Sequence, residues 1–198
     1  TLFMRRTHRR PKRLSRGNSR PWPLLFFFPL SIFFLECVVK VHCFHTLIDR
    51  GLGYAFLFSL PAGLLCALLS SLLGARGNRR VSLLLMGLLT VWYMAQTVYY
   101  TIFRTFLVLD TLGMAGEALS NYWREALAGI GDAIVPLLLL AAPMALLCLL
   151  GRRFVPAQRV RPPVLAAVAG GMAALHLAAV LVVNSATSGI MSPRVLYQ

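Results

Sequence analysis

Acidic residues are scarce in this chain of 198 residues, which has 6 Asp and Glu against 20 Lys and Arg. Charged residues of both signs make up only 13% of the sequence, about half the share that soluble domains carry, while 58% of the residues are hydrophobic. The mean hydropathy is +0.72. A water-soluble fold cannot bury so much apolar surface, so the composition excludes an ordinary soluble domain.

The chain also lacks the groupings that catalytic and metal sites need. Its 4 cysteines lie within or beside apolar stretches, without a Cys-x-x-Cys pair and without histidine at metal-ligand spacing. The few acids are spread along the chain rather than clustered, which disfavours an intramembrane lipid-processing enzyme. We therefore assign no catalytic residue, metal ligand or cofactor to this sequence.

Five long apolar runs are present, and polar segments separate them. The runs are 23–43, 52–74, 81–103, 133–151 and 163–184. Each is close to the roughly 20 residues that a helix needs to cross the ~30 Å hydrocarbon core of a bilayer. The sequence thus predicts an all-α membrane protein in which residues 22–184 form a bundle of five transmembrane helices.

The net charge of +14 comes largely from arginines outside the apolar runs. Residues 1–20 are rich in Arg and Lys and contain no acid, and further arginines separate the second run from the third and the fourth from the fifth. Because basic loops stay in the cytoplasm, residues 1–21 are predicted to be a cytoplasmic tail and 185–198 the start of an external linker. A bilayer explains the charge without a nucleic-acid partner, since no stretch combines basic residues with stacking aromatics.

The predicted external segment, 104–132, is too long for an idle connection. Its second half places Leu119, Trp123, Leu127 and Ile130 on one face of a helix. This pattern indicates an interfacial helix on the outer leaflet between the third and fourth transmembrane helices. A short re-entrant or packing helix without a ligand is the alternative.

Two of the runs carry small residues at every fourth position, which lets helix backbones approach closely in lipid. The residues predicted to mediate this packing are Ser59, Gly63, Ala67 and Ser71 in the second run and Ala166, Gly170, Ala174 and Ala178 in the fifth. Chance spacing in helices rich in Ala and Gly is the alternative.

Polar side chains gather where the first run reaches the external side. Glu36 and Lys40 are spaced i and i+4, so they can neutralise each other, and ionisable groups inside a membrane are functional candidates. Alternatively, the pair only lets the helix end near the interface, with Lys40 reaching outward. His176, deep in the fifth run, fits a neutral imidazole bonded to a neighbour better than a proton relay. The candidate contacts to a lipid headgroup or a following domain are Glu36, Lys40, Asp49, Arg50, Tyr100, Arg104, Trp123 and Arg124.

A family resemblance is carried by four stretches in order: FFFPLSIFFLECVVK, LIDRGLGYAFLFSLPAG, VYYTIFRTFL and NYWREALAGI. They resemble the membrane region of lipoteichoic acid synthase family proteins, which are bacterial enzymes of the sulfatase and alkaline phosphatase superfamily. The resemblance extends over nearly the whole chain, from about Pro23 to about Tyr197.

The resemblance implies that the five helices anchor a large extracellular catalytic domain in the cell membrane. In that family a metal-bound threonine takes phosphoglycerol from phosphatidylglycerol and passes it to a growing polymer of the cell wall. A divalent metal of the manganese type is thus implied for that domain. Neither the Asn-Glu-Ser metal motif nor the threonine nucleophile is found in these residues, so this fragment is expected to be catalytically inert.

The partners that the resemblance implies are the lipid bilayer, a phosphatidylglycerol-type lipid and the chain's own extracellular domain. The alternative function is a small multi-pass transporter or transporter subunit. That alternative predicts inverted repeats and broken helices, and the odd number of runs without a repeat disfavours it.

Overall fold

The computed structural model describes residues 22–108, 123–155 and 162–187, and all regular structure in these ranges is helical. The helices are α1 (Trp22–Phe44), α2 (Arg50–Leu69), α3 (Ala75–Phe103), α5 (Trp123–Asp132), α6 (Ile134–Phe154) and α7 (Pro162–Thr187). All of them except α5 are long and apolar enough to cross a membrane. The chain is therefore a multi-pass membrane protein.

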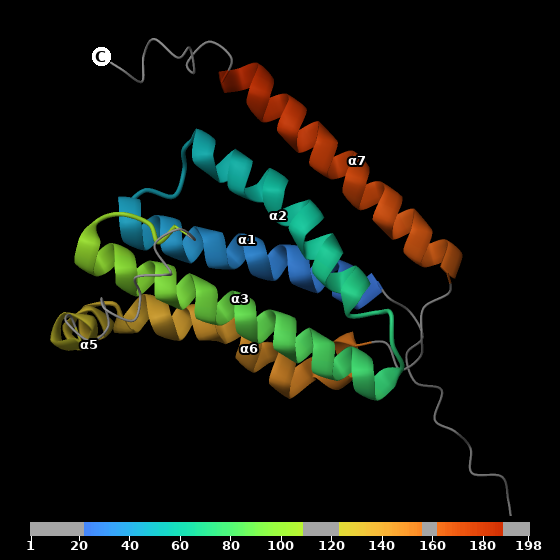
Figure 1. Ribbon diagram of the computed structural model, residues 1–198, viewed down its shortest axis with the longest axis horizontal. Helices are drawn as coiled ribbons and strands as arrows, with labels where there is room; N and C mark the ends of the chain where they lie inside the picture. The colour runs from blue at the N-terminus through green and yellow to red at the C-terminus, as the bar shows by residue number, and fades with distance from the viewer. Residues whose placement is uncertain (1–21, 109–122, 156–161, 188–198) are drawn as a thin grey trace, which may run out of the picture.

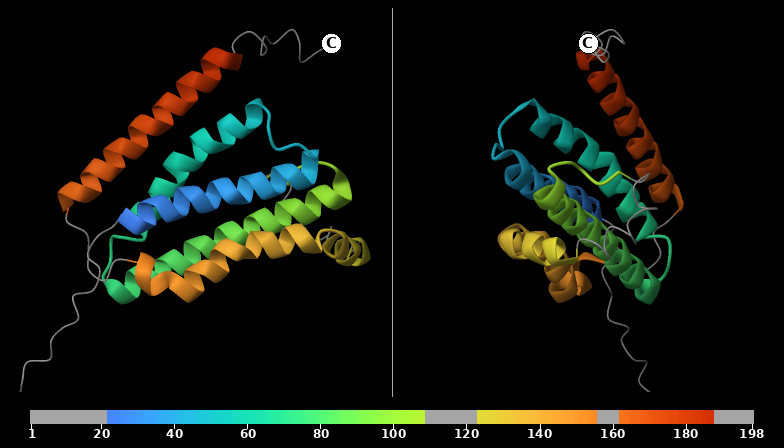
Figure 2. Two further views of the ribbon diagram at one scale, coloured as in Figure 1. Left: turned by 180° about the vertical axis from the view of Figure 1, so that it is seen from behind. Right: turned by 60° about the vertical axis from the view of Figure 1, so that its left-hand side comes forward.

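The five long helices run in alternating directions, so their ends meet at two opposite ends of the bundle (Figure 1). We call one the basic end, because Arg76, Arg79 and Arg80 lie there at the start of α3. The other is called the polar end, since it holds Lys40 and Asp49 where α1 passes into α2. The start of α1 lies at the basic end and the end of α7 at the polar end (Figure 2).

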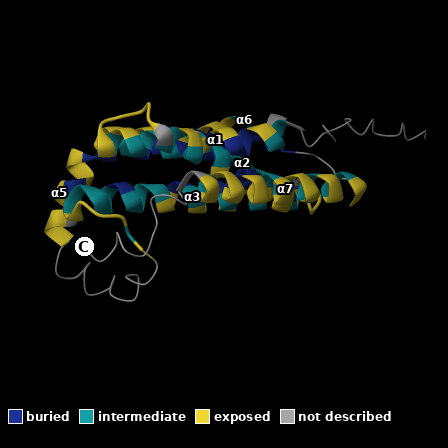
Figure 3. Cartoon of the chain, turned by 90° about the horizontal axis from the view of Figure 1, so that it is seen from above, coloured by how far each residue is buried: buried dark blue, intermediate teal, exposed yellow. Residues whose placement is uncertain are grey.

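Helix α1 is central to the packing, because it contacts α2, α3 and α6. Near the basic end the buried cluster consists of Leu24, Phe27, Phe28, Ala67, Met86, Leu147 and Val155. Nearer the polar end a second cluster consists of Leu35, Val39, Cys43 and Leu140. Among the described helices α7 contacts α2 alone, and most of its surface is exposed (Figure 3).

Helices α1 and α2 touch backbone to backbone near the basic end. A Cβ atom built on Gly63 would lie 2.3 Å from the backbone nitrogen of Pro29, so the contact requires glycine at this position. Towards the polar end the two helices diverge (Figure 1). The divergence opens space beside α1 in the half of the bundle that contains Glu36.

The predicted boundaries are wrong at the turn between α2 and α3. Helix α2 ends at Leu69 rather than at 74, and α3 begins at Ala75 rather than at 81. The Leu73 N–H donates to Asn78 Oδ1 at 2.9 Å, which closes a short turn and lets α3 begin directly after it. The arginines expected in a loop therefore lie on the first turns of α3. The other three spans agree with their predictions to within three residues at each end.

Helix α5 lies crosswise at the polar end, against α3 and α6 (Figure 2). Gly129 is buried in this contact, and a Cβ atom there would lie 2.9 Å from Ile102 Cγ1. The apolar side chains of Trp123, Leu127 and Ile130 are exposed. The first part of the predicted interfacial helix, with Leu119, lies outside the described residues, as do the predicted tail and most of the predicted linker.

The two series of small residues have opposite environments. Ser59, Gly63 and Ala67 are buried on the side of α2 that meets α1, and Ser71, in the turn after α2, is buried as well. Contrary to the prediction, Ala166, Gly170, Ala174 and Ala178 are all exposed. Helix α7 instead meets α2 through another face, on which Ala179 is fully buried and Met172 and His176 line a hollow between the two helices.

Candidate functional site at the polar end

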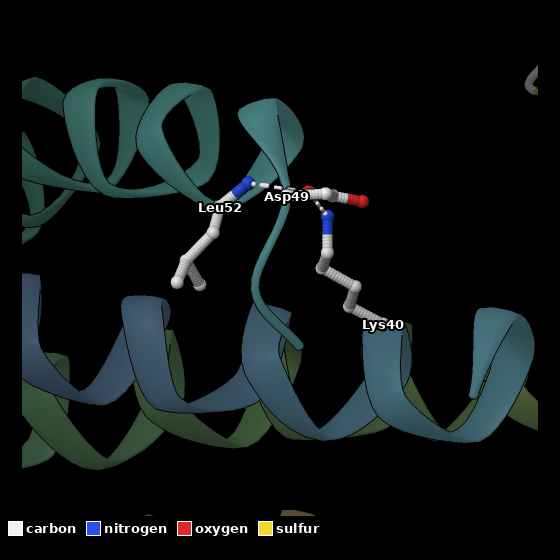
Figure 4. Close-up of polar contacts among 3 residues, drawn as sticks. All are labelled: Lys40, Asp49 and Leu52. Carbon is white, nitrogen blue, oxygen red and sulfur yellow. Dashed lines mark hydrogen bonds and ion pairs between the residues drawn. The ribbon is translucent and has the colours of Figure 1, made fainter. Parts of the chain in front are cut away.

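The connection between α1 and α2 is held by one carboxylate (Figure 4). Asp49 is the N-cap of α2 and accepts a hydrogen bond from the Leu52 N–H at 3.0 Å. The same carboxylate forms an ion pair with Lys40 of α1. A Cβ atom on Gly51 would lie 2.7 Å from Lys40 Nζ, so the adjoining glycine leaves room for the ammonium group. The hydrogen bond from Lys40 lowers the pKa of Asp49, and the Leu52 N–H adds to that shift.

The predicted pairing of Glu36 with Lys40 is wrong. Lys40 reaches outward to Asp49, while the Glu36 carboxylate accepts a hydrogen bond from the Tyr93 hydroxyl on α3, with 2.6 Å between Oη and Oε1. The short connection between α1 and α2 brings Asp49 back to Lys40 at the polar end of the bundle. Glu36 lies a turn deeper, so Tyr93 on the neighbouring helix is the partner within reach.

A cavity of about 370 Å³ lies between α1, α2 and α3, and we call it the Glu36 pocket. Its lining residues are Ile32, Glu36, Gly51, Tyr54, Ala55, Phe58, Ser59, Ala62 and Tyr93. Of the described residues that line it, Glu36 alone is charged, and the second carboxylate oxygen has no hydrogen-bond partner in the described structure. The pocket exists because α1 and α2 touch at Gly63 and diverge from there.

A second cavity, of about 410 Å³, lies between α1 and α6 and includes His42 and His45. The Thr101 hydroxyl donates to the Thr97 carbonyl at 2.9 Å, so it is left to accept a hydrogen bond from His42 Nε2, also at 2.9 Å. The imidazole is thereby tied to α3. This arrangement joins α1 to α3.

The other candidate residues lie apart from the Glu36 pocket. Tyr100 packs against Phe106, with 5.0 Å between ring centroids, and Arg104 ends α3 in the left-handed conformation with φ 56°. Arg124 stacks on the Trp123 ring at 5.2 Å on α5, which contacts α3 and α6 but neither α1 nor α2 in the described structure. Arg50 begins α2, and its side chain is not among those described.

His176 is exposed on α7 and meets the edge of the Phe58 ring on α2, with 6.4 Å between centroids. In the described part of the chain this imidazole has an aromatic contact and no hydrogen bond to a neighbour. In the part of the chain that the structure describes, no three His, Cys, Asp or Glu side chains could together hold a metal ion.

Sequence reasoning identified Glu36 but missed Tyr93, Tyr54 and Ser59 as its companions in the pocket. The three residues come from two other helices, and their proximity depends on which faces of α1, α2 and α3 meet. Ser59 was predicted to mediate packing, and its hydroxyl donates to the Phe56 carbonyl at 2.8 Å. No spacing within one helix could have predicted this grouping.

The site offers one carboxylate, two phenol groups and a serine hydroxyl within an apolar wall. Such a set can bind a polar headgroup that donates hydrogen bonds. The Ser59 hydroxyl donates to the Phe56 carbonyl and the Glu36 carboxylate accepts from Tyr93, so the described hydrogen bonds do not join this hydroxyl to this carboxylate. Comparison of the chain with protein-family models, with curated proteins and with solved structures found no match.

Proposed function

We propose that this chain is the membrane anchor of an enzyme of the lipoteichoic acid synthase type, which holds an extracellular catalytic domain close to the outer leaflet. The observation that carries the proposal is the odd number of long helices in the described ranges, which puts the end of α7 opposite the start of α1. With arginines at the basic end, the positive-inside rule favours a cytoplasmic start of α1 and an external end of α7. Any domain that follows α7 would then act outside the cell.

An anchor of this kind contributes proximity rather than chemistry. A tethered active site meets the lipids of its own leaflet at a high effective concentration, without any new contact to the substrate. Helix α5 supports this arrangement, because its exposed Trp123, Leu127 and Ile130 suit a helix that lies in the outer interface. In this proposal phosphatidylglycerol is the lipid handled by the extracellular domain, and a divalent metal belongs to that domain.

The transporter alternative has less support from the described helices. Several of their buried hydroxyl groups donate to carbonyls of their own helix, as Ser82 does to Asn78 and Thr97 to Tyr93. Two hydrogen bonds that join described helices, Tyr93 to Glu36 and His42 to Thr101, lie towards the polar end. A transport pathway would need polar groups that continue through the bundle to the basic end.

Topology is the first test of the proposal. A reporter enzyme that is active only outside the cytoplasm would be fused after Gln198, and the same reporter would be inserted at 158 as the matched control. We expect activity from the first fusion and none from the second. An inactive fusion after Gln198 together with an active one at 158 would invert the topology and overturn the anchor proposal.

The second test concerns the enzyme itself. The complete reading frame that contains this chain would be expressed, and its membranes would be assayed for diacylglycerol released from phosphatidylglycerol, with and without manganese. We expect metal-dependent release. A product that ends near Gln198, or a larger product without this turnover, would contradict the assignment to a phosphoglycerol transferase even if the topology is as expected.

A further inference from the structure

The Glu36 pocket contains a carboxylate whose charge is not balanced by a described neighbour. Lys40, the nearest candidate in the sequence, pairs with Asp49 instead, and its ammonium lies beside Gly51 at one edge of the pocket. Tyr93 satisfies Oε1 only, and Tyr54 and Ser59 add neutral groups to the wall. A carboxylate in a membrane is stabilised by a partner that brings both a positive charge and hydrogen-bond donors.

The pocket lies beside a larger apolar groove. A hollow of about 700 Å³ runs between α2 and α7, lined from α2 by Phe58, Pro61, Ala62 and Leu65. Phe58 and Ala62 also line the Glu36 pocket, so these two side chains form a wall that the two hollows share. Beyond them the groove continues along Met172, Ala173, His176, Leu177 and Val180 of α7.

A hollow that holds one carboxylate and lies beside an apolar groove matches a ligand with two chemically different parts. We propose that the Glu36 pocket and the α2–α7 groove together bind an amphiphile with a primary ammonium headgroup. The ammonium donates to the free oxygen of Glu36, and an alkyl chain lies along the groove against Phe58 and Leu177. This site is independent of the anchor function, because it needs neither the following domain nor its substrate.

The chemistry of the wall excludes other common headgroups from the same position. A phosphate diester without a cation would place a second negative charge beside Glu36, which costs free energy at low dielectric. A quaternary ammonium carries the charge but has no N–H to donate to Oε2. A primary ammonium has three N–H groups, which matches the Glu36 carboxylate and the hydroxyl oxygens of Tyr54 and Ser59.

Lipid retention by the purified chain tests the proposal. Native mass spectrometry in detergent would compare dioleoyl lipids with ethanolamine, choline or glycerol headgroups, titrated one at a time. We expect the ethanolamine lipid to bind at least about tenfold more tightly than the other two, because of the three headgroups only ethanolamine can donate a charge-assisted hydrogen bond to Glu36. Glu36→Gln should remove this preference, whereas Glu125→Gln, at an exposed acid on α5, should leave it unchanged.

A second variant covers the case in which Glu36→Gln does not fold. Ala62→Leu retains the carboxylate but fills the junction of pocket and groove, and it should lower the affinity for the ethanolamine lipid by a similar factor. Ala178→Leu, on the exposed side of α7, is its matched control. Equal affinity for the three lipids, a preference for the glycerol headgroup, or a preference that survives both pocket variants would overturn the proposal.

Discussion

Helices α1 and α7 have the same mean hydropathy, 2.2, yet their environments differ completely. In α1, 44% of the residues in the most apolar window are buried inside the protein, whereas in α7 the share is 6%. Helix α1 packs against three long helices and α7 against one. Hydropathy therefore predicts that a helix crosses the membrane, and the shapes of neighbouring surfaces determine what it packs against.

The side chains explain the difference. Helix α1 presents large residues that fill the bundle, among them Phe28 and Leu35, which are fully buried. Helix α7 is rich in Ala and Gly, and among the described helices it contacts α2 alone, with Ala179 as its one fully buried side chain. Small residues permit close approach only where a complementary surface lies opposite, as Pro29 does for Gly63.

The largest expected effect distinguishes two glycines at similar depth. Gly63→Ala should lower the free energy of unfolding by about 2–3 kcal/mol, because the new methyl group would overlap the Pro29 backbone, which cannot move as a side chain can. Gly170→Ala should cause no loss, since nothing lies within 4 Å of the added Cβ and alanine favours the helix. Unfolding in mixed detergent micelles measures both. Equal losses would show that α7 is packed in solution.

The Gly63 contact also shows how far the sequence could predict the structure. The five spans follow from the length of the apolar runs, and the buried series on α2 follows from its four-residue spacing. The same spacing on α7 predicted a contact that is not formed, because periodicity does not reveal which surface lies opposite. Likewise, Glu36 was identified as an ionisable residue within a span, but its partner Tyr93 comes from a helix 57 residues away in sequence.

A smaller effect is expected where α7 meets α2. Ala179→Leu should destabilise the protein by about 1 kcal/mol, less than a similar change within the α1–α2 contact, because α7 has a single neighbour and can shift away. Ala178→Leu, at the adjacent exposed position, should change the free energy of unfolding by less than about 0.5 kcal/mol. The same micelle titration compares the two. A larger loss at 178 than at 179 would mean that the other face of α7 is the packed one.

The hydrogen bond between Tyr93 and Glu36 joins α3 to α1, whereas the side-chain contact described between α7 and α2 is the one between the rings of His176 and Phe58. Tyr93→Phe should cost about 1 kcal/mol of unfolding free energy, the usual contribution of one part-buried hydrogen bond. His176→Phe serves as the control on α7, where the ring meets only the edge of Phe58. An unchanged stability for Tyr93→Phe would indicate that the hydroxyl is equally well satisfied elsewhere.

The smallest expected effect concerns Asp49, which secures the connection from α1 to α2. Asn at this position keeps an N-cap acceptor but removes the charge that pairs with Lys40. Since the Lys40 hydrogen bond lowers the pKa of Asp49 in the folded protein, the stabilisation is fully present above the ordinary Asp pKa of about 3.9 and is lost as the pH falls through the lowered value. Asp49→Asn should thus be slightly less stable than the parent chain at pH 7 and equal to it in strong acid. Thermal unfolding from pH 7 to pH 2 measures the convergence, and a stability gap that persists unchanged in acid would mean that the carboxylate acts through its shape rather than its charge.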